Sequence, residues 1–154
     1  MFRGNLPAKI EDNGRLKLPV PFKELLDAAN VTELYVTSED GERAQIWPLG
    51  EWKKIEQKLA KHSAVNEEVK TYLDWTGFYG HQVKIDAQGR IVLQQLLRTD
   101  AKLEGDLSVM GRINHLEVVN SSLFKQNLPG RKVTSDTRRV VDMFVAEESE
   151  KSGS

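Results

Sequence analysis

The stretch KIEDNGRLKL at residues 9–18 returns as KIDAQGRIVL at residues 84–93, an offset of 75. In both copies a glycine directly precedes an arginine, an acid lies four positions before that arginine, and apolar residues flank the unit. This pattern predicts two strands joined by a tight turn. Two copies at a period of about 75 indicate a duplicated half-domain, because solenoids use shorter periods and more copies.

The turn length decides which side chains meet across each predicted hairpin. A two-residue Asn13-Gly14 turn would place Ile10 beside Lys17 and mix polarity on both faces, so it is disfavoured. A three-residue loop with glycine in the left-handed conformation makes one face apolar and the other charged. Its register pairs Ala8 with Leu18, Ile10 with Leu16 and Glu11 with Arg15, then Val83 with Leu93, Ile85 with Ile91 and Asp86 with Arg90. Each acid is therefore expected to form an ion pair with the arginine of its own copy.

The remaining sequence predicts short helices and strands in an α+β chain. Asn30 is expected to end the first helix in a left-handed conformation, and Asn66 to cap the start of another. The predicted helices lie near residues 21–29, 51–61, 66–77, 96–105 and 140–145, and another starts at 120–122. The further strands are predicted near 34–37, 44–47, 107–110 and 115–119. The polar residues 147–154 are expected to be disordered.

Composition narrows the possible functions. The 154 residues contain no cysteine, which excludes disulfides and thiolate metal sites and suits a reducing compartment, so a cytoplasmic protein is expected. No apolar run approaches 18 residues, so no membrane segment is predicted. The net charge of -1 conceals a basic beginning with Arg3, Lys9, Arg15 and Lys17. A local cationic face is thus compatible with an acidic total.

No catalytic or metal-binding pattern accompanies these features. His62, His81 and His115 lie far apart without ligand spacing, so no metal is expected. Glu11 and Asp12 are adjacent and should diverge, and no phosphate loop or nucleophile elbow is present. The sequence therefore predicts neither an enzyme nor a cofactor.

Three tryptophans and one basic cluster are predicted to have structural rather than binding roles. Trp47, Trp52 and Trp75 are predicted to be core or subunit-interface anchors rather than platforms for stacked bases. The basic cluster at residues 131–139 is predicted to be a solvated helix face.

The chain resembles the MraZ family of transcriptional regulators, within the AbrB-like swapped-hairpin superfamily. The resemblance extends from MFRGN at residues 1–5 to about residue 128. It rests on the duplicated acid-x-x-Gly-Arg units, on IWPLGEW at residues 46–52 leading into a helix, and on Gly89-Arg90-Ile91.

This resemblance implies two AbrB-like halves interleaved as a pseudo-twofold double β-barrel with flanking helices. The expected divisions are 1–76, 77–130 and a C-terminal segment 131–154 with a basic stretch, a possible helix and an acidic tail. The family implies a nucleoid-associated regulator, a repressor of the division and cell-wall gene cluster that binds upstream direct repeats of double-stranded DNA. It also implies a homo-oligomeric ring, an octamer or similar.

The expected DNA-binding residues are cations of the two hairpins and of the N-terminus: Arg3, Lys9, Arg15, Lys17 and Arg90. Glu11 and Asp86 are the expected orienting carboxylates. The chain departs from the family at Glu11, where Asp is usual, and at Gln94, where Pro often stands. Val92 replaces the lysine that repeat one has at Lys17. Two alternatives stay open: the arginines could make purely structural ion pairs, and the protein could be an oligomeric scaffold module that does not bind DNA.

Overall fold

The computed structural model describes residues 1–153, with side chains through Glu147. It divides into two compact units, Met1–Leu123 and the residues from Phe124 onward. The first unit contains both copies of the repeated stretch. Its strands are β1 (Asn5–Ala8), β2 (Arg15–Lys17), β3 (Glu33–Thr37), β4 (Ala44–Pro48), β5 (His81–Lys84), β6 (Arg90–Val92), β7 (Leu107–Gly111) and β8 (Leu116–Asn120).

The helices confirm most of the local predictions. They are α1 (Val20–Ala28), α2 (Leu49–Ala60), α3 (Glu67–Phe78), α4 (Gln95–Asp100), α5 (Ser121–Asn127) and α6 (Ser135–Gly153), with a 3-10 helix η1 (Leu128–Arg131). Asn30 has φ 56 after α1, as predicted for a left-handed cap. Asn66 caps α3, because its side chain accepts hydrogen bonds from the backbone N–H groups of Glu68 and Val69.

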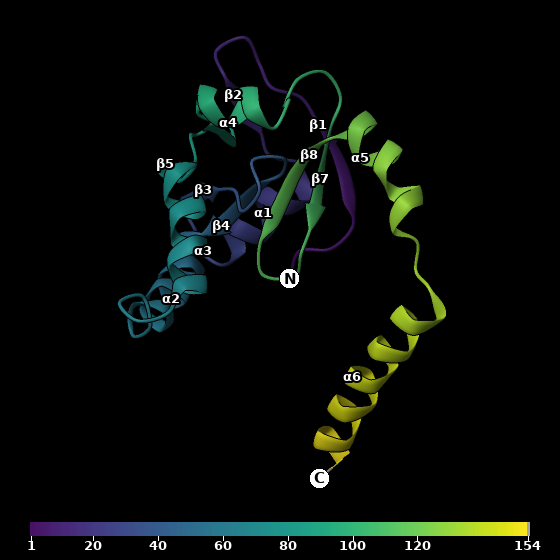
Figure 1. Ribbon diagram of the computed structural model, residues 1–154. Helices are drawn as coiled ribbons and strands as arrows, with labels where there is room; N and C mark the ends of the chain where they lie inside the picture. The colour runs from purple at the N-terminus through teal and green to yellow at the C-terminus, as the bar shows by residue number, and fades with distance from the viewer. Residues whose placement is uncertain (154) are drawn as a thin grey trace. The chain divides into compact units, whose positions relative to one another are not determined.

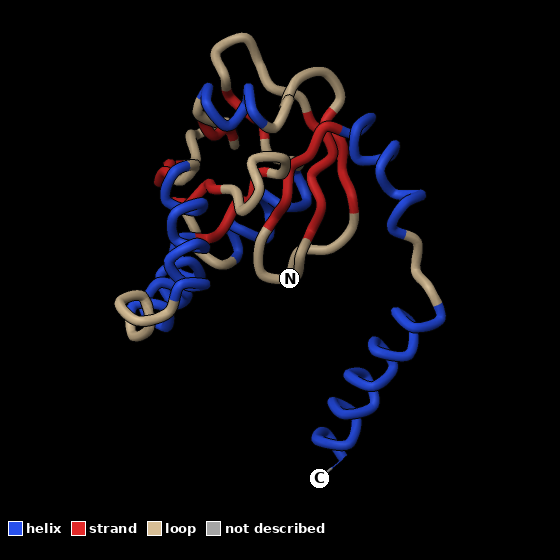
Figure 2. The backbone as a smooth tube through the Cα atoms, in the orientation of Figure 1, coloured by secondary structure: helices blue, strands red, loops and turns tan. Residues whose placement is uncertain are grey.

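The strands form a six-stranded antiparallel sheet and a separate two-stranded ribbon (Figures 1 and 2). The sheet order is β1-β7-β8-β4-β3-β5, and the ribbon pairs β2 with β6. Each strand of the sheet has a counterpart about 75 residues away in the other repeat: β1 corresponds to β5, β3 to β7 and β4 to β8. If every strand is replaced by its counterpart, the order is the same when read from the other edge of the sheet. The two repeats are therefore interleaved about a pseudo-twofold axis, which passes between β4 and β8 and through the ribbon.

The α+β class is confirmed, whereas the closed double β-barrel is not seen. Within residues 1–153, β1 and β5 end the sheet and do not pair with each other, so the sheet stays open. The two strands of the ribbon, β2 and β6, pair with each other and not with a strand of the six-stranded sheet.

The predicted hairpin register is correct near the turns and wrong beyond them. Glu11 N–H donates to the Arg15 carbonyl at 2.8 Å, Asp86 N–H to that of Arg90 at 3.0 Å, and Ile10 bridges Leu16. Ala8, however, pairs with Leu107 and Val83 with Leu34, not with Leu18 and Leu93. Strands β1 and β5 leave their own hairpins because the larger sheet offers each of them a full partner strand.

The core is built from equivalent positions of both repeats. Leu16 and Ile91, Leu18 and Leu93, and Phe22 and Leu97 are each at most 2% exposed. A fully buried side chain of this size contributes roughly 1.5–3 kcal/mol. Because each repeat supplies half of this core, neither half can bury it alone.

Of the three tryptophans predicted to be core or subunit-interface anchors, two lie in the core. Trp52 is buried against Tyr35, and Trp47 is buried and stacks on His115 with ring centroids 3.9 Å apart. Trp75 is 43% exposed, so it does not belong to the core.

The second unit contains η1 and α6. On α6 the basic stretch makes ion pairs within the helix, Arg138 with Asp142 and Arg139 with Asp136. The helix continues from Glu147 to Gly153, where the sequence predicts a disordered tail, and Ser154 lies outside the described residues.

Candidate nucleic-acid interface

The ribbon of β2 and β6 brings three of the five predicted DNA-binding cations together. In its register Lys17 lies opposite Arg90, Leu16 opposite Ile91 and Arg15 opposite Val92. Leu16 and Ile91 are buried. Since side chains alternate along a strand, Arg15, Lys17, Arg90 and Val92 form the outward face. We call these four residues the ribbon face.

Paired backbone hydrogen bonds hold the two turns against each other. Leu18 N–H donates to the Gly89 carbonyl at 2.9 Å, and Leu93 N–H donates to the Gly14 carbonyl at 3.0 Å. Gly14 and Gly89 both have φ +78, the left-handed conformation that the three-residue loop requires. Each turn is therefore secured by the other repeat.

The predicted ion pairs within each copy are wrong, because the ion pair on the ribbon joins the two copies. Arg90 Nε lies 2.9 and 2.8 Å from the two carboxylate oxygens of Glu11, and Arg90 Nη1 donates to Gln88 Oε1 at 2.6 Å. The pairing of β2 with β6 causes this exchange, since it places Lys17 rather than an acid opposite Arg90 and brings the first turn beside β6. Arg90 is held by the protein itself.

Asp86 orients its own turn rather than an arginine side chain. Its Oδ1 accepts hydrogen bonds from the N–H groups of Gln88 and Arg90, at 2.8 and 2.9 Å. These backbone hydrogen bonds, that from Arg90 first, lower the pKa of Asp86, and the nearby charges of Arg15 and Arg90 lower it further. The carboxylate thus stays ionised and holds the second turn closed.

Arg15 and Lys17 are the cations that the ribbon leaves uncommitted. Both are exposed, and neither side chain makes a hydrogen bond or ion pair within residues 1–147. Asp86 influences Arg15 only through the field between their charges. Two exposed donors on one face are suited to bind an external polyanion.

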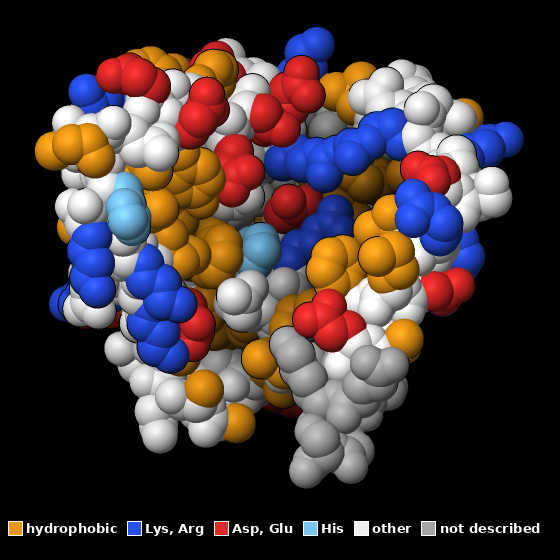
Figure 3. Space-filling view, turned by 60° about the horizontal axis from the view of Figure 1, so that its bottom comes forward, with side chains coloured by type: hydrophobic (Ala, Val, Ile, Leu, Met, Phe, Trp, Pro, Cys, Tyr) orange, Lys and Arg blue, Asp and Glu red, His pale blue; other side chains and the backbone are white. Residues whose placement is uncertain are grey.

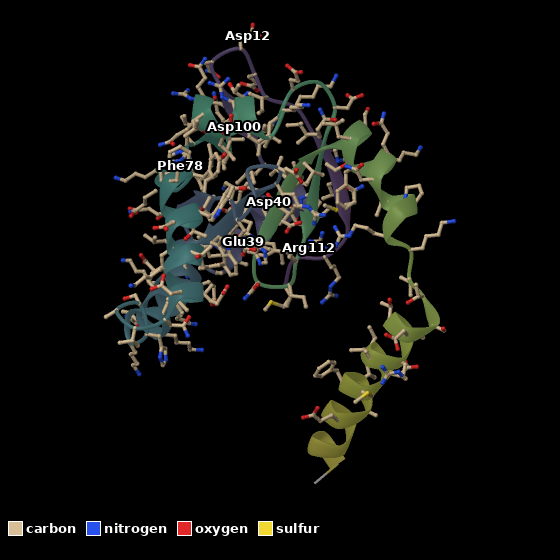
Figure 4. The ribbon with its side chains drawn as sticks, viewed as in Figure 1. Asp12, Glu39, Asp40, Phe78, Asp100 and Arg112 are labelled. Atoms are coloured by element: carbon tan, nitrogen blue, oxygen red, sulfur yellow. The ribbon has the colours of Figure 1, made fainter. Side chains whose placement is uncertain are left out.

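The other two predicted cations are not residues of the β2–β6 ribbon. Lys9 is exposed and lies 3.7 Å from Asp106, in the loop after α4. Arg3 lies at the β7–β8 turn, since Phe2 bridges Ile113 and Gly111 N–H donates to the Gly4 carbonyl. Asp12, at the first turn, and Arg112, near the β7–β8 turn, lie at opposite ends of the sheet in Figure 4. Arg3 is therefore not part of the ribbon face.

The end of the molecule opposite the ribbon has mixed charge. Arg112 donates to Glu117 at 3.0 Å, and Arg43 lies 3.6 Å from the same carboxylate. The space-filling view of this end shows Lys and Arg side chains interspersed with Asp and Glu (Figure 3).

Two cations behind the turns were missed by the sequence analysis. Lys23 on α1 and Arg98 on α4 are half-buried and occupy equivalent positions at the offset of 75. Arg98 packs on Gly14, and Lys23 packs on Gly89, each on the turn of the other repeat. The signal was present in the sequence as a second pair of equivalent cations after each repeated stretch.

Titratable groups elsewhere do not form a reactive site. Burial lowers the pKa of His81 and of His115, and burial and Glu39 raise that of Tyr72. Among the described residues no three His, Cys, Asp or Glu side chains gather to hold a metal ion. The described helices also include none with the length and apolar character needed to cross a membrane.

Comparisons with known proteins identify relatives along almost the whole chain. Residues 79–138 match the family described as "MraZ protein, putative antitoxin-like". A transcriptional regulator MraZ of Acidobacterium capsulatum is 43% identical over 144 residues, which cover 94% of this chain and 99% of the relative. Proteins of the same name from Koribacter versatilis and Syntrophobacter fumaroxidans are 37% and 29% identical, covering 92% and 94% of this chain and 97% and 94% of the relatives.

Proposed function

Because the chain belongs to the MraZ family, whose relatives are named transcriptional regulators, we propose that it is a DNA-binding transcriptional regulator. As the family resemblance implies, it acts as a repressor of the division and cell-wall gene cluster. It binds direct repeats upstream of these genes as a cytoplasmic, nucleoid-associated protein. It is not an enzyme and needs no cofactor.

The observation that carries the proposal is the ribbon face. A two-stranded β-ribbon fits the major groove of B-DNA, where arginine and lysine donate to guanine and to phosphates. Arg15 and Lys17 point outward without protein partners in the described chain, while Leu16 and Ile91 anchor the ribbon in the core. Rigid support and free donors together suit sequence-specific contact.

The cations divide into three roles. Arg15 and Lys17 bind DNA directly. Arg90 is held in a fixed place on the face by Glu11, whose charge offsets its own. Lys9, beside Asp106, and Arg3, at the β7–β8 turn, contact flanking phosphates that position the protein without reading sequence.

The active form is a homo-oligomeric ring, an octamer or similar, in which each chain carries two interleaved swapped-hairpin repeats, residues 1–76 and 77–130. The large apolar side chains left exposed support an assembly, since soluble monomers seldom expose large contiguous apolar patches. On α3, Trp75 is 43% exposed and Phe78, three positions later, is 64% exposed.

Chromatin pull-down followed by sequencing tests the proposed function in the cell. The tagged wild type is expected to enrich DNA upstream of the division and cell-wall genes, and Arg15→Ala is expected to lose that enrichment. Lys58→Ala removes an exposed cation of α2 and serves as the control. If the wild type enriches no DNA and instead captures one protein partner in nuclease-treated extract, the scaffold function is the better account.

A further inference from the structure

Arg98 packs directly against the backbone of the first turn. A Cβ atom built on Gly14 would lie 3.0 Å from Arg98 Nη2, 3.1 Å from Cζ and 3.3 Å from Nε. The guanidinium therefore fills the space that a side chain at position 14 would need. It belongs to the second repeat, whereas the turn that it touches belongs to the first.

A short relay of hydrogen bonds also links Arg98 to this turn. Arg98 Nε–H donates to the Leu93 carbonyl at 2.9 Å, and Leu93 N–H donates to the Gly14 carbonyl at 3.0 Å. Leu93 is buried, so this relay runs through fixed backbone. Arg15 follows Gly14 directly, and its backbone direction depends on how this glycine is held.

The second turn lacks the equivalent arrangement. A Cβ atom on Gly89 would meet only the aliphatic stem of Lys23, at 3.7 Å, an ordinary contact distance. The ammonium of Lys23 instead pairs with Asp27 on its own helix at 2.5 Å. Lys23 thus offers an internal control at the same position of the pseudo-twofold.

We propose that Arg98 of the second repeat is a positioning residue for the DNA-binding turn of the first repeat. Its guanidinium fixes Gly14 by contact and fixes the Gly14 carbonyl through Leu93. That Arg98 supports DNA binding rests on the proposed function, whereas its contacts with the first turn are those described above. It explains why a binding surface concentrated in repeat one still requires repeat two.

Hydrogen exchange tests the positioning without any DNA. In Arg98→Met the amide of Leu93 is expected to exchange about tenfold faster. The substitution removes the hydrogen bond to the Leu93 carbonyl and the contact with Gly14, so Gly14, whose carbonyl accepts from the Leu93 amide, is held less firmly. In Lys23→Met the equivalent amide of Leu18, which donates to Gly89, should change by less than about twofold. Unchanged Leu93 exchange in Arg98→Met would overturn the proposal.

DNA affinity then separates positioning from direct contact. Arg98→Met is expected to weaken binding about tenfold, and Arg98→Lys nearly as much, because lysine has no donor at the Nε position. In the Arg15→Ala background the same change should cost less than about twofold, since a positioning residue acts through the residue that it positions. If Arg98→Lys binds DNA as tightly as the wild type, Arg98 contacts DNA by itself and the positioning role is wrong. The same holds if Arg98→Met weakens binding as much in the Arg15→Ala background as it does in the wild type.

The two assays fail in distinguishable ways. If the wild type does not bind DNA at all, the proposed function is wrong, and the exchange result alone decides whether Arg98 holds the turn. If the wild type binds DNA but Arg98→Met binds equally well, the positioning role is wrong and the proposed function stands.

Discussion

At the scale of single residues, the carboxylate of Glu11 separates the roles of two equivalent arginines. Arg15 and Arg90 occupy the same position of the repeat, yet Glu11 binds Arg90 through both oxygens and leaves Arg15 without a side-chain partner among the described residues. The two cations differ because only one acid of the two turns reaches across the ribbon. The Oδ1 atom of Asp86 instead accepts hydrogen bonds from backbone N–H groups of its own turn.

Removing the charge of Glu11 is therefore expected to strengthen DNA binding. Glu11→Gln takes a negative charge off the DNA-facing side and releases Arg90, so affinity should rise a few-fold at low salt. Because the Glu11 side chain is 40% exposed, stability should fall by no more than about 1 kcal/mol. Fluorescence anisotropy with operator DNA measures the affinity.

The control for this prediction is Asp12→Asn. Asp12 is exposed in the same turn, and the acid that pairs with Arg90 is Glu11, so this change alters the net charge equally but leaves the Glu11–Arg90 ion pair intact. It should raise affinity less than Glu11→Gln does. If Glu11→Gln weakens binding, the carboxylate supports DNA contact by Arg90 and the assigned roles are wrong.

His81 is expected to make stability depend on pH. Its Nδ1 is buried without a hydrogen-bond partner, and its Nε2 lies 3.3 Å from the Val92 carbonyl. Burial lowers its pKa, although that carbonyl opposes the shift. The folded chain therefore favours the neutral ring of His81. The free energy of unfolding is at its full value above the ordinary histidine pKa of about 6.5, and it decreases as the pH falls below that pKa, because the ring must then be protonated.

Thermal unfolding between pH 7.5 and 5.5 measures this effect. The midpoint of the wild type should fall as the pH is lowered, and His81→Gln should show a shallower fall. Lys58→Ala, an exposed substitution on α2, serves as the control and should keep the slope of the wild type. Equal slopes for all three proteins would contradict a role for His81.

At the scale of elements, the two turns share a backbone conformation but differ in what surrounds them. Gly14 and Gly89 both have φ +78, so an alanine at either position costs about 1–2 kcal/mol for the left-handed backbone. At Gly14 the new Cβ would also meet the Arg98 guanidinium at 3.0 Å, whereas at Gly89 it would meet Lys23 at 3.7 Å.

Gly14→Ala is therefore expected to destabilise the chain by about 1–3 kcal/mol more than Gly89→Ala, because crowding adds to the shared backbone cost. Urea unfolding of the two variants provides the comparison. Equal losses would mean that Arg98 yields freely, and the close packing of the first turn would then have no energetic consequence.

Local signals predicted the helices and turns, because their causes lie within a few residues. The Asn66 cap, the left-handed Asn30 and both turn glycines follow from short-range chemistry. Strand partners could not be predicted in this way. Ala8 pairs with Leu107, about a hundred residues away, and nothing in either hairpin shows that a better partner exists.

The same limit applied to the candidate site. The choice of Arg15 and Lys17 came from their alternation along a strand, which the ribbon preserves. The partner of Arg90 depended on the pairing of β2 with β6, which joins the two repeats and so could not be read from either one.

At the scale of the whole molecule, the two repeats are interleaved in one sheet and one ribbon, and the proposed DNA-binding face is the ribbon face. Each chain then offers two free cations on its ribbon, too few for tight binding alone. A homo-oligomer that engages several direct repeats at once would gain affinity through effective concentration.

DNA with two correctly spaced repeats is accordingly expected to bind at least about 100-fold more tightly than DNA of the same length with one repeat. Shifting one repeat by about 5 bp, half a helical turn, should remove most of this gain, because the second site then faces away. Affinity that is unaffected by repeat number would contradict the multivalent assembly.

The salt dependence of DNA binding tests the ribbon face most directly. Wild type, Arg15→Ala, Lys17→Ala and Lys58→Ala are compared on one operator over a series of salt concentrations. If Arg15 and Lys17 neutralise phosphates, each of their variants should reduce the slope of log affinity against log salt by about 0.9 per bound copy, and Lys58→Ala should leave it unchanged. Unchanged slopes and affinities for both ribbon variants would show that the ribbon of β2 and β6 is not the DNA-binding surface.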